Sequence, residues 1–162
     1  MSEPRWLGIA RKYIGVREIP GPQHNTTIMD WLRRLGSWIK DDETPWCGSF
    51  CAAVMQEAGL PYPATYPRAR AWADYGSRLQ THLLAPGAIL VFARDGGGHV
   101  GFYVAEDATH YHVLGGNQGN AVNVTRIAKA RLIASRWPKG EPVRGRPVWV
   151  KANGLPVSEN EA

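Results

Sequence analysis

Apolar residues in the first part of the chain recur at the spacing of an α-helix. Three stretches show this pattern: residues 4–14, a stretch that Thr26 or Thr27 can cap, and residues 46–59. Pro4 suits the first turn of the first helix, because proline lacks the backbone N–H that a first turn leaves unpaired. The pattern therefore predicts three amphipathic helices, each of which buries one face.

From residue 88 onward the apolar positions follow the shorter period of β-strands. Short runs of this kind, separated by turn residues, occupy residues 88–92, 99–104, 111–114, 121–124 and 132–137. Strands that follow one another through short turns pair in antiparallel fashion. The chain is therefore predicted to belong to the α+β class, with N-terminal helices packed on a mainly antiparallel sheet of about five to six strands.

The 162 residues, of which 44% are hydrophobic, suit a single domain with a core of its own. Between the helices and the strands, residues 61–87 are rich in proline and carry one short helical stretch at 69–75, which predicts a long surface connection. Farther along, proline, glycine and charged residues dominate, apart from an apolar island at 148–150. We therefore expect one domain over residues 1–138 and a loosely held tail over residues 139–162.

Lysine and arginine outnumber the acidic residues by 19 to 14, which gives a net charge of +5. A positive balance favours contact with anionic polymers such as nucleic acid, cell-wall polymer or phospholipid. The sequence has no block of basic residues, no zinc-finger spacing and no RNA-recognition motif, which argues against nucleic acid. It also lacks a run of ~20 apolar residues, so we expect no membrane insertion. The first residues have neither a basic nor an apolar leader region, so we expect no Sec signal.

The two cysteines occupy different places in the third predicted helix. Cys47 follows Pro45 and Trp46 at the first turn, where unpaired N–H groups and the positive end of the helix dipole favour a thiolate. Cys51 lies one turn farther in and shares the apolar stripe, which is typical of a buried cysteine. Cys47 is therefore the candidate nucleophile, although its place on the same stripe leaves a purely structural role open.

A thiol nucleophile needs a base, and the chain offers five histidines: His24, His82, His99, His110 and His112. His99 follows three glycines and opens a predicted strand, where a substrate can approach the backbone closely. His110 and His112 share one face of another strand, but no third ligand at a matching spacing supports a metal site. We therefore choose His99 as the base and expect no metal and no cofactor.

A catalytic imidazole also needs an acceptor for its second nitrogen. Asn117 is the first candidate, because it follows the strand that is expected to pair beside the strand of His99. Gln118 or a backbone carbonyl is the alternative. For the oxyanion of an acyl-transfer reaction, the backbone N–H of Cys47 is available, and the sequence identifies no second donor.

The order of a helix-borne cysteine, a strand-borne histidine and a polar residue after the next strand resembles the papain-like cell-wall hydrolases of the CHAP and NlpC/P60 group. The resemblance covers roughly residues 4–138. It is carried by the segments PWCGSF at 45–50, PGAILVF at 86–92, GHVGFY at 98–103 and LGGNQ at 114–118, with weaker likeness at 6–18.

This resemblance implies hydrolysis of a peptidoglycan amide bond, with Cys47 as nucleophile, His99 as base and Asn117 as orienting residue. It further implies that Trp46, Gly98 and Gln118 contact the substrate. Many relatives in the group have a second histidine or a glutamate near the orienting position, where this chain has Gly115 and Asn117. No carboxylate from that strand therefore supports His99.

A compact hydrolase without a leader resembles phage endolysins, which are made in the cytoplasm and reach the wall through a holin. A toxin delivered by a secretion machine is the second possibility, and in either case we expect a monomer that acts on peptidoglycan. The resemblance leaves open whether the bond is an N-acetylmuramoyl-L-alanine amide or a peptide bond of the stem or cross-link.

Two other functions remain open. A muramidase or lytic transglycosylase would use carboxylates, for which Glu18, Glu43 and Glu57 are available. A non-catalytic wall-binding or phage structural module would keep the fold without turnover.

Overall fold

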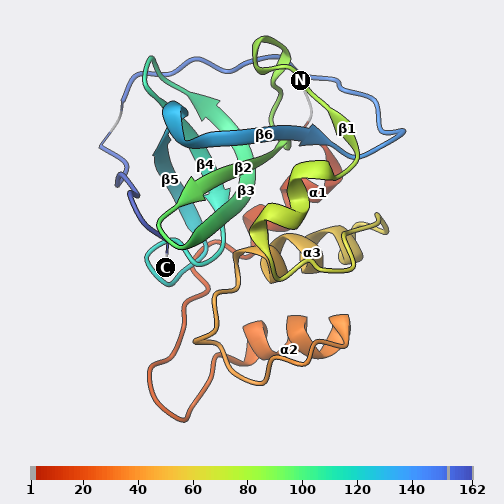
Figure 1. The fold of residues 1–162 in the computed structure, drawn as a ribbon, viewed down its shortest axis with the longest axis vertical. Coiled ribbons are helices and arrows are strands. Elements are labelled where there is room, and N and C mark those ends of the chain that lie inside the picture. The colour runs from red at the N-terminus through yellow and green to blue at the C-terminus, as the bar shows by residue number, and fades with distance from the viewer. Residues whose placement is uncertain (1–2, 153, 162) are drawn as a thin grey trace.

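The computed structural model describes residues 3–152 and 154–161, and it has the predicted α+β architecture, with helices first and a sheet second (Figure 1). The α-helices are α1 (Arg5–Lys12), α2 (Thr26–Leu35) and α3 (Cys47–Glu57). Short 3-10 turns are η1 (Ala69–Asp74), η2 (Thr81–Leu83) and η3 (Lys129–Arg131). Among the described helices, none has the length and apolarity needed to cross a membrane.

The three predicted helices are present, but two of their starts differ from the prediction. Asn25, rather than a threonine, caps α2, because its side-chain oxygen accepts hydrogen bonds from the backbone N–H groups of Thr27 and Ile28. Pro4 is the N-cap of α1 and has an extended backbone, so it precedes the first turn. These are shifts of a single residue that leave the buried faces unchanged.

The strands form one six-stranded sheet in the order β1-β6-β2-β3-β4-β5. Its strands are β1 (Ser77–Arg78), β2 (Ile89–Arg94), β3 (Gly97–Glu106), β4 (His110–Gly115), β5 (Asn123–Ala128) and β6 (Leu132–Trp137). Every neighbouring pair is antiparallel, as predicted. The pattern of apolar residues missed β1, because its two residues are polar and exposed.

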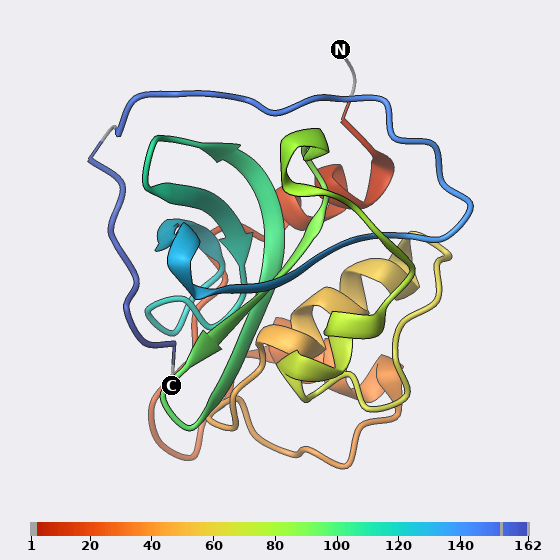
Figure 2. The same cartoon turned by 45° about the horizontal axis from the view of Figure 1, so that its top comes forward.

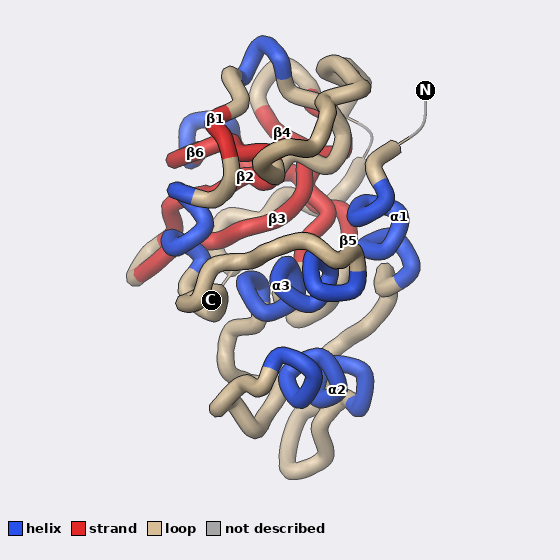
Figure 3. Tube along the Cα trace, turned by 90° about the vertical axis from the view of Figure 1, so that its right-hand side faces the viewer, coloured by secondary structure: helices blue, strands red, loops and turns tan. Residues whose placement is uncertain are grey.

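Helix α3 lies between the sheet and α2 (Figure 3). Aromatic rings fill the space around it: the ring of Trp31 on α2 lies 5.4 Å from that of Phe50 and 6.0 Å from that of Trp46, and Tyr13 lies 5.0 Å from Trp31. Burial of such large side chains stabilises a fold by several kcal/mol in total, roughly 1.5–3 kcal/mol for each. This packing fixes the N-terminal end of α3 beside the sheet.

The segment that the sequence predicts to be a loosely held tail, residues 139–162, contacts the sheet at two places within its described residues. The segment after β6 runs around the sheet and ends beside the tip of β2 (Figures 1 and 2). It forms parallel β-bridges between Trp149 and Glu106 and between Val157 and Arg126. Backbone hydrogen bonds of 2.8–2.9 Å flank both bridges. The prolines of this segment lack a backbone N–H and so interrupt regular strand pairing. The other backbone groups of the tail still pair with the sheet.

Candidate active site

Cys47 is the first residue of α3, and only 5% of its surface is exposed. The preceding Trp46 caps the helix without a side-chain acceptor, so the backbone N–H groups of the first turn stay available to the thiol and to an oxyanion beside it. Against burial, which raises the pKa of the Cys47 thiol, His99 and then the backbone N–H groups of Val100 and Gly48 lower it. The sequence therefore placed the candidate nucleophile correctly at a helix N-terminus.

Gly48 lets the loop after α3 approach the start of this helix. A Cβ atom at this position would lie 2.0 Å from the backbone oxygen of Tyr66, a distance that no backbone group tolerates. We expect Gly48→Ala to lower the free energy of unfolding by about 3 kcal/mol, because either α3 or the loop must move. The matched change Gly8→Ala in α1, where nothing lies within 4 Å, should instead raise it by about 0.5–1 kcal/mol.

Denaturation by urea measures both changes in the free energy of unfolding. Equal stability of the two variants would contradict the close approach of Tyr66 to α3.

His99 lies on β3, opposite Phe92 of β2, and is fully buried. Its Nε2 lies 2.9 Å from Oε1 of Gln118. The amide nitrogen of Gln118 donates to the carbonyl of Val113 and to Asn123, so the amide oxygen must face the imidazole. Nε2 therefore carries the proton, and Nδ1 is the basic nitrogen of neutral His99.

The amide that contacts Nε2 of His99 is that of Gln118, the alternative from the sequence, whereas the side chain of Asn117 has another partner. Asn117 has a φ of 59°, which turns the chain so that its side chain and that of Gln118 leave the loop in different directions. Its amide nitrogen donates to the backbone oxygen of Glu161, 2.9 Å away. The sequence kept Gln118 as the alternative but gave no means of deciding between two adjacent amides.

Nδ1 of His99 is buried and has no aligned hydrogen-bond partner among the residues that the structure describes. The imidazole nevertheless lies close enough to Cys47 for the two groups to shift each other's pKa. Burial raises the pKa of the Cys47 thiol, but the interaction with His99 and the backbone N–H groups of Val100 and Gly48 together outweigh burial and leave that pKa below its usual value. Such a loose contact is common before a substrate binds.

The pKa of His99 moves in the opposite direction. Burial lowers it, but the interaction with Cys47, the charge of Glu161 and the hydrogen bond to Gln118 together raise it above its usual value. A lowered thiol pKa beside a raised imidazole pKa favours the thiolate–imidazolium pair. The two shifts move the thiol and imidazole pKa values toward the order that the pair requires, and the pair is lost when acid protonates the thiolate or alkali deprotonates the imidazolium.

Cys51 shows the behaviour of a structural cysteine. It is fully buried one turn farther along α3, and its Sγ lies 3.9 Å from the carbonyl oxygen of Val100. Burial, followed by the charge of Cys47, raises its pKa well above the usual value. One helix therefore carries a thiol that ionises readily and a thiol that does not.

The residues predicted to contact substrate divide into two groups. Trp46 is buried, and its Nε1 donates to Oε1 of Glu18 at 2.8 Å, so its ring packs in the core and does not face a ligand. Gln118 is also buried and is committed to His99. Gly98 is half-buried beside Arg70, whose guanidinium donates to the carbonyl oxygen of Gly97. Of the three, Gly98 alone stays a candidate for substrate contact.

Two groups of titratable side chains elsewhere have structural partners. Asp42 accepts hydrogen bonds from the backbone of Ile19 and Asn25 and contacts His24, which braces the loop before α2. His24, Asp42 and Glu43 lie close enough to share an ion, but the oxygens of Asp42 are already committed to these contacts.

The histidines of β4 likewise have protein partners. His112 lies 2.8 Å from Asp107, which also accepts from Arg126 at 2.9 Å. His110 contacts Thr109 and Arg126. Both histidines of this strand are therefore engaged by neighbouring side chains.

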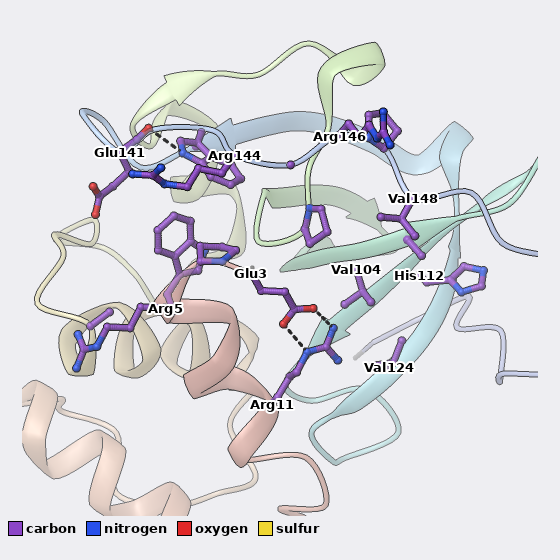
Figure 4. Close-up of a pocket in the computed structure, with 18 of the residues that line it drawn as sticks. Glu3, Arg5, Arg11, Val104, His112, Val124, Glu141, Arg144, Arg146 and Val148 are labelled. Atoms are coloured by element: carbon purple, nitrogen blue, oxygen red, sulfur yellow. Dashed lines mark hydrogen bonds and ion pairs between the residues drawn. The ribbon is translucent and has the colours of Figure 1, made fainter. Parts of the chain in front are cut away.

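A cavity of about 930 Å³ lies away from the thiol, between α1, the sheet and the tail (Figure 4). Arg144 and Arg146 of the tail line one side, and Arg11, paired with Glu3, lines another. Cys47, His99 and Gln118 are not among its lining residues. The cavity is therefore separate from the candidate active site.

Neither the models of known protein families nor the curated proteins give a match to this chain. The geometry therefore carries the chemical interpretation. A cysteine at a helix N-terminus, a buried histidine on a neighbouring strand and an amide that fixes its tautomer form the arrangement needed for nucleophilic acyl transfer. Glu161, which influences His99, was missed because it lies in the segment predicted to be a loose tail.

Proposed function

We propose that this protein is a cysteine hydrolase that cleaves an amide bond of peptidoglycan, in the manner of papain-like endolysins. The observation that carries the proposal is the placement of Cys47 at the start of α3, beside a buried His99 whose Nε2 is held by Gln118 at 2.9 Å. The opposite directions of the two pKa shifts agree with this placement. A buried structural cysteine shows the reverse shift, as Cys51 does. The substrate class rests on the resemblance of the four sequence segments and on the net charge of +5, which suits an anionic wall polymer.

The reaction runs in two halves. Sγ of the Cys47 thiolate attacks the carbonyl carbon, and first-turn N–H groups of α3 stabilise the oxyanion that forms. The C–N bond then breaks while His99 gives its Nδ1 proton to the leaving amine, which leaves a thioester on Cys47. In the second half, neutral His99 takes a proton from water at Nδ1, the hydroxide attacks the thioester, and the C–S bond breaks to release the acid and the thiolate.

Two alternative functions, a glycosidase and a non-catalytic binding module, can be weighed against the structure. Among the carboxylates available to a glycosidase, Glu18 binds the ring nitrogen of Trp46, and Glu57 accepts from the hydroxyl of Tyr13 at 2.5 Å. Both are committed to structural contacts, which weakens that alternative. A binding module would need no activated thiol, so the state of Cys47 favours an enzyme over a binder.

Digestion of purified peptidoglycan tests the proposal directly. We expect the full-length protein to release soluble fragments with new amine and carboxyl ends, which mass spectrometry identifies, and we expect prior alkylation with iodoacetamide to stop their release. The fragment masses identify the bond that is cut. New reducing or anhydro-sugar ends would support a glycosidase, and sedimentation of the protein with peptidoglycan without fragments would support a binding module. Either result would overturn the proposal.

A further inference from the structure

The last described residues of the C-terminal segment contact the elements that hold His99, although the sequence gives no sign of this. Glu161 is the last residue that the structure describes, and its side chain is fully buried. Building on the proposed function, we propose that Glu161 is a positioning residue of the active site: it anchors the loop that orients His99 and places a negative charge near the imidazolium.

Three contacts hold Glu161 in place. Its Oε1 lies 2.5 Å from Nη2 of Arg131, and its Oε2 lies 3.1 Å from Nη1 of the same guanidinium. The hydroxyl of Ser158 donates to Oε2. Arg131 in turn donates through Nε to the carbonyl oxygen of Ala93 at 2.9 Å. A buried carboxylate with a two-point contact to arginine has a fixed position and a fixed charge.

The contact between Arg131 and Ala93 connects Glu161 to the strand that carries His99. Ala93 belongs to β2 and pairs with Gly98, the residue that precedes His99 on β3. The Arg131–Glu161 pair therefore lies against β2 near its end at Arg94, where the chain turns into β3. One end of the catalytic strand thus depends on the C-terminal segment.

A second link runs through the loop after β4. Nδ2 of Asn117 donates to the backbone oxygen of Glu161 at 2.9 Å, and the next residue, Gln118, holds Nε2 of His99 at 2.9 Å. Asn117 has a left-handed backbone, which asparagine tolerates better than most residues. The hydrogen bond to the C-terminal segment holds the loop in this conformation and so fixes the position of Gln118.

The charged groups around His99 give Glu161 an electrostatic role as well. Helix α3 contributes Cys47, the loop after β4 contributes the neutral amide of Gln118, and η1 contributes Arg70, which binds the carbonyl oxygen of Gly97. Glu161 is the carboxylate whose charge acts on His99, and its partner Arg131 offsets part of that charge. The loop itself supplies no carboxylate, so the C-terminal segment supplies the negative charge.

The pH dependence of Cys47 alkylation by iodoacetamide tests this role in the full-length protein. For a thiolate–imidazolium pair, the rate rises with pH through the pKa of the thiol and again through the pKa of the imidazolium. Removal of the negative charge in Glu161→Gln should lower the pKa of His99, so the second rise should move to lower pH by roughly half a unit or more. The reverse change, Arg131→Gln, exposes His99 to the full charge of Glu161 and should move that rise to higher pH.

Glu159→Gln is the matched control, because it removes the same charge from an exposed site two residues earlier. It should leave both rises unchanged, and Glu161→Asp, which keeps the negative charge, should leave the second rise close to its wild-type position. If folded Glu161→Gln shows the wild-type profile, or if Glu159→Gln shifts it equally, the proposal is overturned. If Glu161→Gln does not fold, the direction of the Arg131→Gln shift decides instead. Alkylation needs no peptidoglycan, so this result is independent of whether the proposed substrate is cleaved.

Discussion

Replacement of Cys47 by alanine should abolish the release of peptide fragments from peptidoglycan, with a loss of about 10⁴-fold or more in rate. Without Sγ no thioester can form. Within the described structure, the only other nucleophilic side chain in the first turn of α3 is the hydroxyl of Ser49, which is buried. The fold should persist, because alanine fills nearly the same space. Mass spectrometry of the soluble fragments measures the loss.

Cys51→Ala is the matched control for this prediction. It removes the same group from the same helix, but from a thiol whose pKa is raised by burial. We expect a loss of stability of about 1 kcal/mol, from a small cavity, and activity within a few-fold of wild type. Equal activity of wild type and Cys47→Ala would show that Cys47 is only a core residue and would contradict the thiol mechanism.

The spacing of apolar residues was sufficient to predict the fold class, because α1 and α2 each bury one face against a common core. Helix α3 is the exception, since its residues from Cys47 to Met55 are all buried, on the apolar stripe and off it. The features that this spacing missed have physical causes. Strand β1 has no apolar residue to mark it, and the tail pairs through backbone groups, which no side-chain pattern records.

The candidate site was predictable to the extent that it depends on local structure. Cys47 is recognisable because a helix start changes the chemistry of a thiol, and His99 because glycines precede a strand there. The orienting residue depends instead on the backbone turn at Asn117, and the role of Glu161 depends on a contact between residues 44 positions apart in sequence. Neither is visible in a linear pattern, because both follow from the path of the chain in space.

Replacement of Gln118 by leucine should reduce the rate of hydrolysis by about 10³-fold, the second-largest effect that we expect. Leucine has nearly the same shape but offers no acceptor to Nε2 of His99, so the ring can adopt the wrong tautomer or rotate away from Cys47. The change also leaves the carbonyls of Val113 and Asn123 without their donor, so some loss of stability accompanies it. Activity per folded protein, with folding checked by circular dichroism, measures the catalytic part.

Gln118→Glu separates orientation from simple damage to the loop. A carboxylate still accepts from Nε2 but cannot donate to Val113 or Asn123, so its structural defect matches that of the leucine variant. Its negative charge stabilises the imidazolium, so the pKa of His99 should rise and the alkaline limit of activity should move to higher pH.

Gln80→Leu, at an exposed position without a side-chain cap, makes the same chemical change away from the site and should leave activity unchanged. If Gln118→Leu and Gln118→Glu lose the same activity with the same pH profile as wild type, then Gln118 supports only the loop. In that case the tautomer of His99 must be fixed by another group.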